Sequence, residues 1–151
     1  MSFEVIGIDR IFVAVRDMNA AKGYYDRVMP ILGFRCGSGS IGEAPHVFYH
    51  GRQLVYALRP AREGAADHDP YAPGLHHLCF RVVDEEAVDR AARELREAGV
   101  EIAEPRYYPE YGQEDYYATF FEDPDGRRLE MMNFRELRRK LMCNWQASAD
   151  I

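Results

Sequence analysis

The chain has 151 residues and a formal net charge of -6, and charged and aromatic residues make up 29% and 13% of it. This length predicts one compact domain with a sizeable apolar core. The negative charge argues against nucleic-acid binding, which needs a basic surface, and no apolar run approaches the roughly 18 residues that a membrane-spanning helix needs. The N-terminus lacks the pattern of a secretory signal, so we expect a cytoplasmic protein that does not enter a membrane.

The first predicted elements form a βαβββ module over residues 5–59. A strand rich in β-branched residues at 5–15 leads to Asp17, which is placed to cap a helix at about 18–29. Three short strands follow, at 34–36, 47–50 and 54–58. The glycine-rich residues 37–42 are expected to separate the first two of them.

Residues 60–74 contain three prolines together with Ala, Gly and Asp, a composition typical of a linker. A second module is predicted at 75–134, where a strand at 75–83 precedes Asp84, the expected cap of a helix that ends at Gly99. The remaining strands are predicted at 100–103, at 116–122 and, after a turn at 123–126, through Phe134.

Residues 135–151 form a tail that we expect to be helical, because Leu137, Leu141 and Trp145 recur at i, i+4 and i+8. This apolar stripe needs a cover, which favours a packing contact or a homodimer. The basic residues of the tail are interpreted as a solvated helix face: Arg135, Arg138, Arg139 and Lys140.

The three cysteines, Cys36, Cys79 and Cys143, are widely spaced and include no Cys-x-x-Cys pair. An odd number without such a pair argues against a disulfide framework and against a structural zinc site. We therefore interpret them as free thiols.

The second half of the chain repeats the first. Residues 8–17 match 75–84, and residues 51–56 match 126–131, so each half opens with a strand and an Asp and closes with a Gly-led strand. Such self-similarity predicts a duplicated βαβββ module.

The paired modules resemble the vicinal oxygen chelate superfamily, which includes glyoxalase I, extradiol dioxygenases and bleomycin-resistance proteins. The resemblance covers residues 5–134 and is carried mainly by 74–82 (GLHHLCFRV) and 117–130 (YATFFEDPDGRRLE). It implies an α+β fold in which two tandem βαβββ modules form a curved, partly open, eight-stranded barrel-like sheet with the helices outside, plus a C-terminal helix. The reaction stays open, because a fold does not fix a function.

The resemblance implies a shared metal site in the metal-dependent members. Each module there supplies a His from its first strand and a Glu or related oxygen ligand from its last strand, and these side chains converge on one divalent metal. His77 and Glu130 occupy these positions in the second module, whereas Arg10 and Val55 occupy them in the first. Two protein ligands are fewer than the three of a usual catalytic site. Both a zinc, manganese, iron or nickel ion at this partial site and a metal-free site therefore remain open.

Alternation along the strands assigns their faces, because residues two apart point the same way. Ile11, Val13 and Val15 are expected to pack on a helix. The opposite faces of the strands are then predicted to line a cavity, with Arg10, Val55, His77, Cys79, Arg81, Arg128, Glu130 and Met132 among the lining residues.

In this cavity His77 and Glu130 are the candidate catalytic groups, as general acid or base. Arg10 is always protonated and repels a cation, so it is predicted to pair with Glu130 in place of a metal. Alternatively, Arg10 with Arg81 and Arg128 would hold a carboxylate or phosphate of a ligand. Each role has a plainer alternative: a hydrogen-bonded core histidine, an exposed carboxylate, or arginines with their heads in water.

Five tyrosines crowd the segment before the last hairpin: Tyr107, Tyr108, Tyr111, Tyr116 and Tyr117. They are predicted to line a pocket for a flat or apolar ligand, or else to form an ordered surface loop packed on its own rings. The predicted ligand-binding residues besides the arginines are Tyr117, Cys79 and Met132.

Two main functions remain in competition, and an accessory or regulatory subunit of another protein is a third possibility. One is an enzyme of the glyoxalase and dioxygenase type, a lyase, isomerase or dioxygenase, that acts on a small, oxygen-bearing, anionic metabolite in a cavity between the modules. The alternative is a metal-free small-molecule binding protein of the bleomycin-resistance type. Under either of these two functions we expect the protein to bind a small molecule, and to bind neither nucleic acid nor a membrane.

Overall fold

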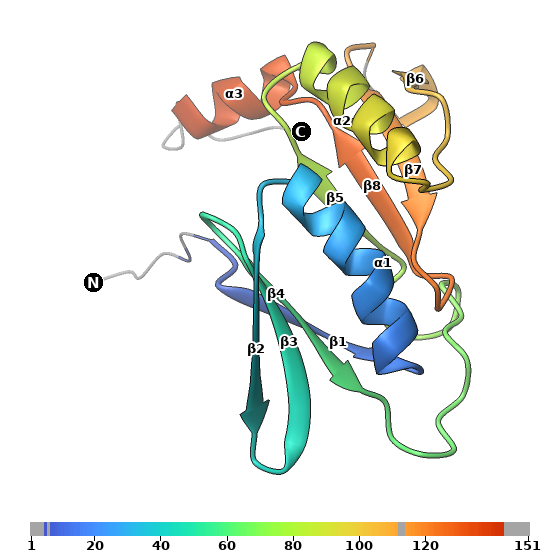
Figure 1. Ribbon diagram of the computed structural model, residues 1–151. Coiled ribbons are helices and arrows are strands. Elements are labelled where there is room, and N and C mark those ends of the chain that lie inside the picture. Colours follow the sequence, from blue (N-terminus) through green and yellow to red (C-terminus); the bar gives the residue numbers. More distant parts are fainter. Residues whose placement is uncertain (1–4, 6, 112–113, 144–151) are drawn as a thin grey trace. The chain divides into compact units, whose positions relative to one another are not determined.

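The computed structural model describes residues 5, 7–111 and 114–143 (Figure 1). The first module contains β1 (Arg10–Val15), α1 (Met18–Ile31), β2 (Arg35–Ile41), β3 (Ala44–His50) and β4 (Val55–Pro60). Its strands form one open sheet in the order β1-β4-β3-β2, in which β1 runs parallel to β4 and the other neighbours are antiparallel. The helix α1 packs against β2 and β4.

The second module repeats this arrangement. Its elements are β5 (His77–Arg81), α2 (Glu85–Glu97), β6 (Arg106–Tyr107), the short 3-10 helix η1 (Pro109–Tyr111), β7 (Tyr117–Glu122) and β8 (Arg128–Met132). The strand order β5-β8-β7-β6 is the equivalent of that in the first module, and β5 again runs parallel to its neighbour. These two βαβββ modules, followed by α3 (Glu136–Cys143), confirm the predicted α+β fold.

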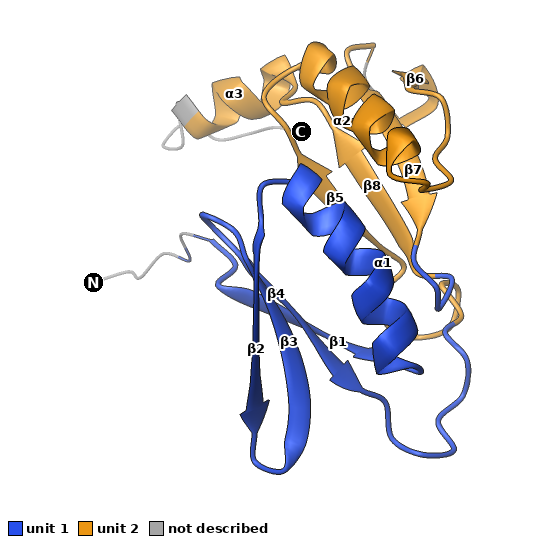
Figure 2. Cartoon of the chain, viewed as in Figure 1, with its two compact units in different colours: residues 1–68, 123–126 blue, residues 69–122, 127–151 orange. Residues whose placement is uncertain are grey.

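The chain divides into two compact units (Figure 2). Unit 1 comprises residues 1–68 and 123–126, and unit 2 comprises residues 69–122 and 127–151. The eight strands form two open four-stranded sheets, one in each unit.

Both predicted helix caps are confirmed. The Asp17 carboxylate accepts hydrogen bonds from the backbone N–H groups of Asn19, at 2.8 Å, and Ala20, at 3.0 Å. The Asp84 carboxylate accepts one from the N–H of Ala87, at 2.9 Å. Each cap satisfies amides that have no partner within the first helical turn, which fixes where the helix begins.

The glycine-rich residues 37–42 were predicted to separate two strands, but most of them lie within β2, which pairs with β3 along its length. Backbone pairing with β3, from Arg35 to Ile41, outweighs the low strand propensity of glycine here. A Cβ added at Gly37 would lie 3.5 Å from the His50 ring, and one at Gly39 would lie 3.5 Å from the Phe48 ring. Both are ordinary van der Waals distances, so the rings do not require glycine at either position.

Two other strand predictions were wrong in their limits. The first strand begins at Arg10, after residues 7–9 that are irregular, and not at residue 5. Residues 100–103 form only an isolated bridge between Ile102 and Phe121, and the edge strand of the second sheet is β6, within the tyrosine-rich segment.

The predicted faces of the first strand are confirmed. Val13 and Val15 are buried and Ile11 is half-buried, whereas Arg10 and Phe12 on the other face are exposed. The buried residues of α1 pack on this apolar face of unit 1: Ala21, Tyr24, Tyr25, Val28 and Met29.

The C-terminal helix α3 confirms the predicted helical tail as far as residue 143. Leu137 and Leu141 are half-buried, and Trp145, the third residue of the predicted stripe, lies outside the described residues. The homodimer contact through this stripe stays a prediction. No helix in the described part of the chain is both long and apolar enough to cross a membrane.

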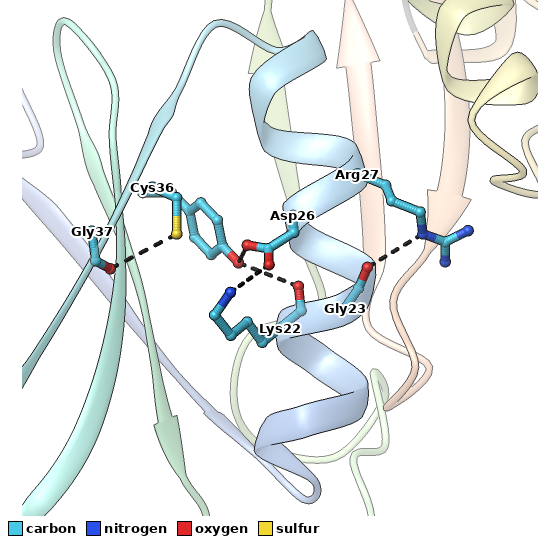
Figure 3. Close-up of polar contacts among 7 residues, drawn as sticks. Lys22, Gly23, Asp26, Arg27, Cys36 and Gly37 are labelled. Atoms are coloured by element: carbon cyan, nitrogen blue, oxygen red, sulfur yellow. Dashed lines mark hydrogen bonds and ion pairs between the residues drawn. The ribbon is translucent and has the colours of Figure 1, made fainter.

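A polar cluster centred on Asp26 links α1 to β2 and β3 (Figure 3). The buried Tyr49 hydroxyl donates to the Asp26 carboxylate at 2.9 Å, and the Lys22 ammonium pairs with the same carboxylate. Burial raises the pKa of the Cys36 thiol, and its hydrogen bond and proximity to Asp26 raise it further. Burial opposes ionisation of Asp26, but Lys22 and Tyr49 outweigh it and hold the Asp26 pKa below its ordinary value.

The substitution Tyr49→Phe is expected to destabilise the fold by about 1.5–2 kcal/mol at pH 7, because it removes a buried hydrogen bond to a charged acceptor. The folded-state pKa of Asp26 is lowered, so its contribution is present above the unfolded-state pKa of about 4 and is lost as the pH falls through the folded value. Urea denaturation at pH 7 and pH 3 checks this. An equal loss of stability at both pH values would contradict the pairing.

Candidate functional site

A pocket of about 240 Å³ lies in unit 2. It is lined by His76, His77, Tyr111, Tyr116, Phe120, Arg128 and Glu130. Four of these residues come from three neighbouring strands, β5, β8 and β7, and the tyrosines come from the segment between β6 and β7. The pocket is therefore formed by one face of the second sheet and the tyrosine-rich segment.

The strand register explains why these side chains meet. In the parallel pair of β5 and β8, His77 lies opposite Arg128 and Cys79 lies opposite Glu130. Arg81 lies opposite Met132 at the end of the same pair. Because side chains alternate along both strands, these six share one face, as the sequence predicts.

Glu130 is the buried centre of the site, with only 1% of its surface exposed. One carboxylate oxygen accepts a hydrogen bond from the Tyr116 hydroxyl, and the other lies 3.2 Å from His77 Nε2. The Cys79 thiol forms a further hydrogen bond with the carboxylate. A buried carboxylate needs such donors, and about four acceptor positions are available on its two oxygens.

Two histidines connect this carboxylate to the surface. His76 Nδ1 lies 2.7 Å from His77 Nδ1, and both rings reach the pocket. One tautomer satisfies both contacts: His76 donates from Nδ1 to His77, and His77 donates from Nε2 to Glu130. The His77 side chain is 39% exposed, so this chain of hydrogen bonds leads from buried carboxylate to solvent.

Two of the donors to Glu130 are held protonated by their surroundings. Burial raises the pKa of Tyr116 well above its ordinary value, and the hydrogen bond and the charge of Glu130 raise it further. Burial likewise raises the pKa of the Cys79 thiol, with Glu130 as the second cause. Both groups therefore remain donors over the whole physiological pH range.

The arginines occupy different positions. Arg128 lies in the pocket wall, with its guanidinium carbon 4.1 Å from the centre of the Phe120 ring. Arg10, in unit 1, is 63% exposed in its side chain and donates from Nε to Asp9 at 3.0 Å. The predicted ion pair of Arg10 with Glu130 stays a prediction.

Tyr117 was predicted to bind the ligand, but the structure places it outside the pocket. Its hydroxyl donates to Asp89 of α2 at 2.7 Å, and its neighbour Ala118 pairs with Met132 on the pocket side of the sheet. Successive residues of a strand point to opposite faces, so Tyr117 is turned toward the helix. The tyrosines of the cluster that line the pocket are Tyr111 and Tyr116.

Two residues of this region were not assigned a role from the sequence. Tyr116 appeared only as one member of the tyrosine cluster, although it donates to Glu130. Arg135 was interpreted as part of a solvated helix face, but it is half-buried and its guanidinium carbon lies 4.9 Å from the centre of the Tyr116 ring.

The protein side chains do not complete a metal site in the described residues, which contain no group of three His, Cys, Asp or Glu residues that could hold a metal ion. His77 and Glu130 supply two donors. The Cys79 thiol is a poor third, because its raised pKa opposes the thiolate form that metals bind. This donor set does not fit the three-ligand pattern of catalytic metal sites.

Cys79 is expected to resist alkylation by iodoacetamide at pH 8, and Glu130→Gln is expected to make it react faster. The carboxylate raises the Cys79 pKa, so its neutralisation lowers that pKa and increases the thiolate fraction. Peptide mass spectrometry over a time course measures the rates, with the exposed Cys36 as the internal reference. Equal Cys79 rates in both proteins would show that the carboxylate does not act on the thiol.

Comparison with known proteins agrees with this architecture. The family model described as the Glyoxalase/Bleomycin resistance protein/Dioxygenase superfamily matches residues 7–131, and the chain therefore belongs to this superfamily. The YqjT protein of Bacillus subtilis (strain 168) is 26% identical over 121 residues, which cover 78% of this chain and 91% of YqjT.

Two solved structures show the same fold. A glyoxylase/bleomycin resistance protein/dioxygenase domain from Frankia sp. EAN1pec has a TM-score of 0.70 at 22% identity, covering 87% of this chain and all (100%) of that one. The fosfomycin resistance protein FosX from Listeria monocytogenes has a TM-score of 0.61 at 18% identity, covering 90% of this chain and 99% of that one.

Proposed function

We propose that this protein is an enzyme that transfers a proton to or from a small, oxygen-bearing, anionic metabolite held in the unit 2 pocket. The observation that supports this proposal is the buried Glu130 carboxylate in the pocket wall, with His77 Nε2 at 3.2 Å. A carboxylate in such a place is a group suited to general acid and base catalysis.

In the proposed step Glu130 removes a proton from a carbon next to a carbonyl group. The electron pair of the broken C–H bond moves to the carbonyl oxygen and forms an enolate, while the proton binds to a carboxylate oxygen. Arg128, which lies in the pocket wall, would stabilise the negative oxygen. Return of the proton to a different atom completes an isomerisation.

The contacts of Glu130 are compatible with this role. Tyr116, His77 and Cys79 occupy three acceptor positions of the carboxylate, which leaves room for one proton from a ligand. Release of that proton to water through His77 and His76 requires both rings to change tautomer, so that His77 Nε2 accepts from Glu130 and His77 Nδ1 donates to His76. Loss of the proton from Glu130, either to the product or by this route to water, restores the carboxylate for the next turnover.

The test is incubation of the protein in D₂O with a panel of small hydroxy and keto acids, followed by proton NMR. We expect loss of a C–H signal next to a carbonyl group for at least one acid, and no loss with the Glu130→Gln protein. Exchange that continues at an equal rate in Glu130→Gln would contradict the proposed role of this carboxylate.

A metal-free binding protein is the second candidate. The aromatic pocket wall of Tyr111, Tyr116 and Phe120 favours it, since rings give large contact areas to a flat ligand. The same panel separates the two candidates. A compound that raises the melting temperature but is recovered chemically unchanged, without deuterium, would indicate binding alone.

A further inference from the structure

Two guanidinium groups lie at the end of the second sheet where α3 begins. Arg81 is the last residue of β5, and its guanidinium carbon lies 4.4 Å from the centre of the Phe134 ring. Arg135 is the next residue along the chain from Phe134, and its guanidinium lies over the Tyr116 ring. The two cations therefore lie against rings near the same end of the sheet.

Neither cation pairs with a carboxylate among the described residues, whereas other cations of unit 2 do. Arg96 binds Glu104 at 2.9 Å and Arg106 binds Glu110 at 3.1 Å. By contrast, Arg81 donates to the weak acceptor Met142 Sδ at 3.9 Å.

The unused donors of Arg135 are the more unusual feature. Its Nε is buried and has no hydrogen-bond acceptor in the described residues. A buried donor without an acceptor costs about 1–3 kcal/mol, and more when it is charged. A bound anion would supply the missing acceptor.

Both cations lie close to the catalytic candidates. Arg135 lies against the ring of Tyr116, whose hydroxyl donates to Glu130. Cys79 shares a strand face with Arg81 and lies opposite Glu130. A group bound by the two arginines would therefore lie beside the buried carboxylate.

We propose that Arg81 and Arg135 bind the anionic group, a carboxylate or a phosphate, of the molecule whose reacting end contacts Glu130. The planar guanidinium forks match the paired oxygens of such groups. The inference rests on the proposed function, because it assigns the second end of the same ligand. It predicts that substrates are acids with a reactive carbonyl group a short distance from the charge.

The test is calorimetric titration of the full chain with inorganic phosphate and, separately, with malonate, at constant ionic strength set with chloride. We expect saturable binding of at least one probe, and the tighter probe identifies the anionic group. Arg81→Gln and Arg135→Gln should each weaken binding about tenfold or more, since each removes charge-assisted hydrogen bonds. Arg135→Lys keeps the positive charge but loses the planar guanidinium. Its affinity for the probe should lie between that of the two Gln variants and that of the natural protein.

Arg138→Gln is the matched control, because Arg138 is an exposed arginine of α3 and should not contribute. An equal loss in Arg138→Gln would overturn the proposal, as would unchanged binding in both test variants. The proposal would also be overturned if Arg128→Gln abolished binding while the Arg81 and Arg135 variants did not. The anion would then bind beside Arg128, at the other end of the paired strands β5 and β8. Glu130→Gln should still bind the probes, so this result is independent of whether Glu130 is the catalytic base.

Discussion

Glu130→Gln is expected to lower the turnover of a substrate found in the D₂O screen by about 10²–10⁴-fold, the usual contribution of a positioned acid or base. The amide has nearly the shape of the carboxylate but does not accept a proton at neutral pH. Tyr116 can still donate to the amide oxygen, so the loss should fall on turnover more than on substrate binding. Steady-state kinetics, analysed separately for kcat and KM, measures this split.

The matched control for this prediction is Glu122→Gln. Glu122 lies on β7, is exposed, and is not among the residues that line the pocket. The same chemical change there should leave kcat within about twofold, since the carboxylate does not contact the ligand. If kcat fell equally in both variants, the effect would be electrostatic and Glu130 would not be the base.

The fold and the centre of the site were predictable because their signals are regular. Matching residues of the two halves gave the module twice, and alternation along the strands placed His77 and Glu130 on one face. Parallel pairing of β5 with β8 preserves that alternation from one strand to the next. A pair of residues far apart in the sequence could therefore be assigned to one site without knowledge of the structure.

The rest of the site lies on segments without such regularity. Tyr116 precedes β7 and Arg135 precedes α3, so neither strand alternation nor helical spacing indicates where its side chain points. The sequence prediction named Tyr117, and not Tyr116, as a ligand-binding residue. Alternation along β7 places Tyr117 and Phe120 on opposite faces of the sheet. The glycines of β2 were also misinterpreted, because glycine is uncommon in strands and its pairing with β3 depends on the adjacent strand.

Tyr25→Phe is expected to destabilise unit 1 by about 2–3 kcal/mol. The Tyr25 hydroxyl is fully buried in unit 1, lies 2.8 Å from the Tyr56 hydroxyl, and donates to the Asp123 carboxylate at 2.8 Å. Its removal takes one partner from each of two buried polar groups, one of them charged, and this loss costs more than an exposed hydrogen bond would. Chemical denaturation with a fixed m-value measures the change.

Ring packing can be separated from hydrogen bonding in this prediction. Phenylalanine at position 25 retains the contact with the Tyr56 ring, since the centres of the two rings lie 5.2 Å apart. The substitution therefore leaves almost no cavity, and little stability is lost through packing. Tyr71→Phe at an 83% exposed position is the control and should change stability by less than about 0.5 kcal/mol. In a double-mutant cycle, Tyr56→Phe should cost less in the Tyr25→Phe background than alone, because the shared hydrogen bond is already lost. Additive losses would mean that the two hydroxyls act independently, and that Asp123 alone accounts for the stability that Tyr25 provides.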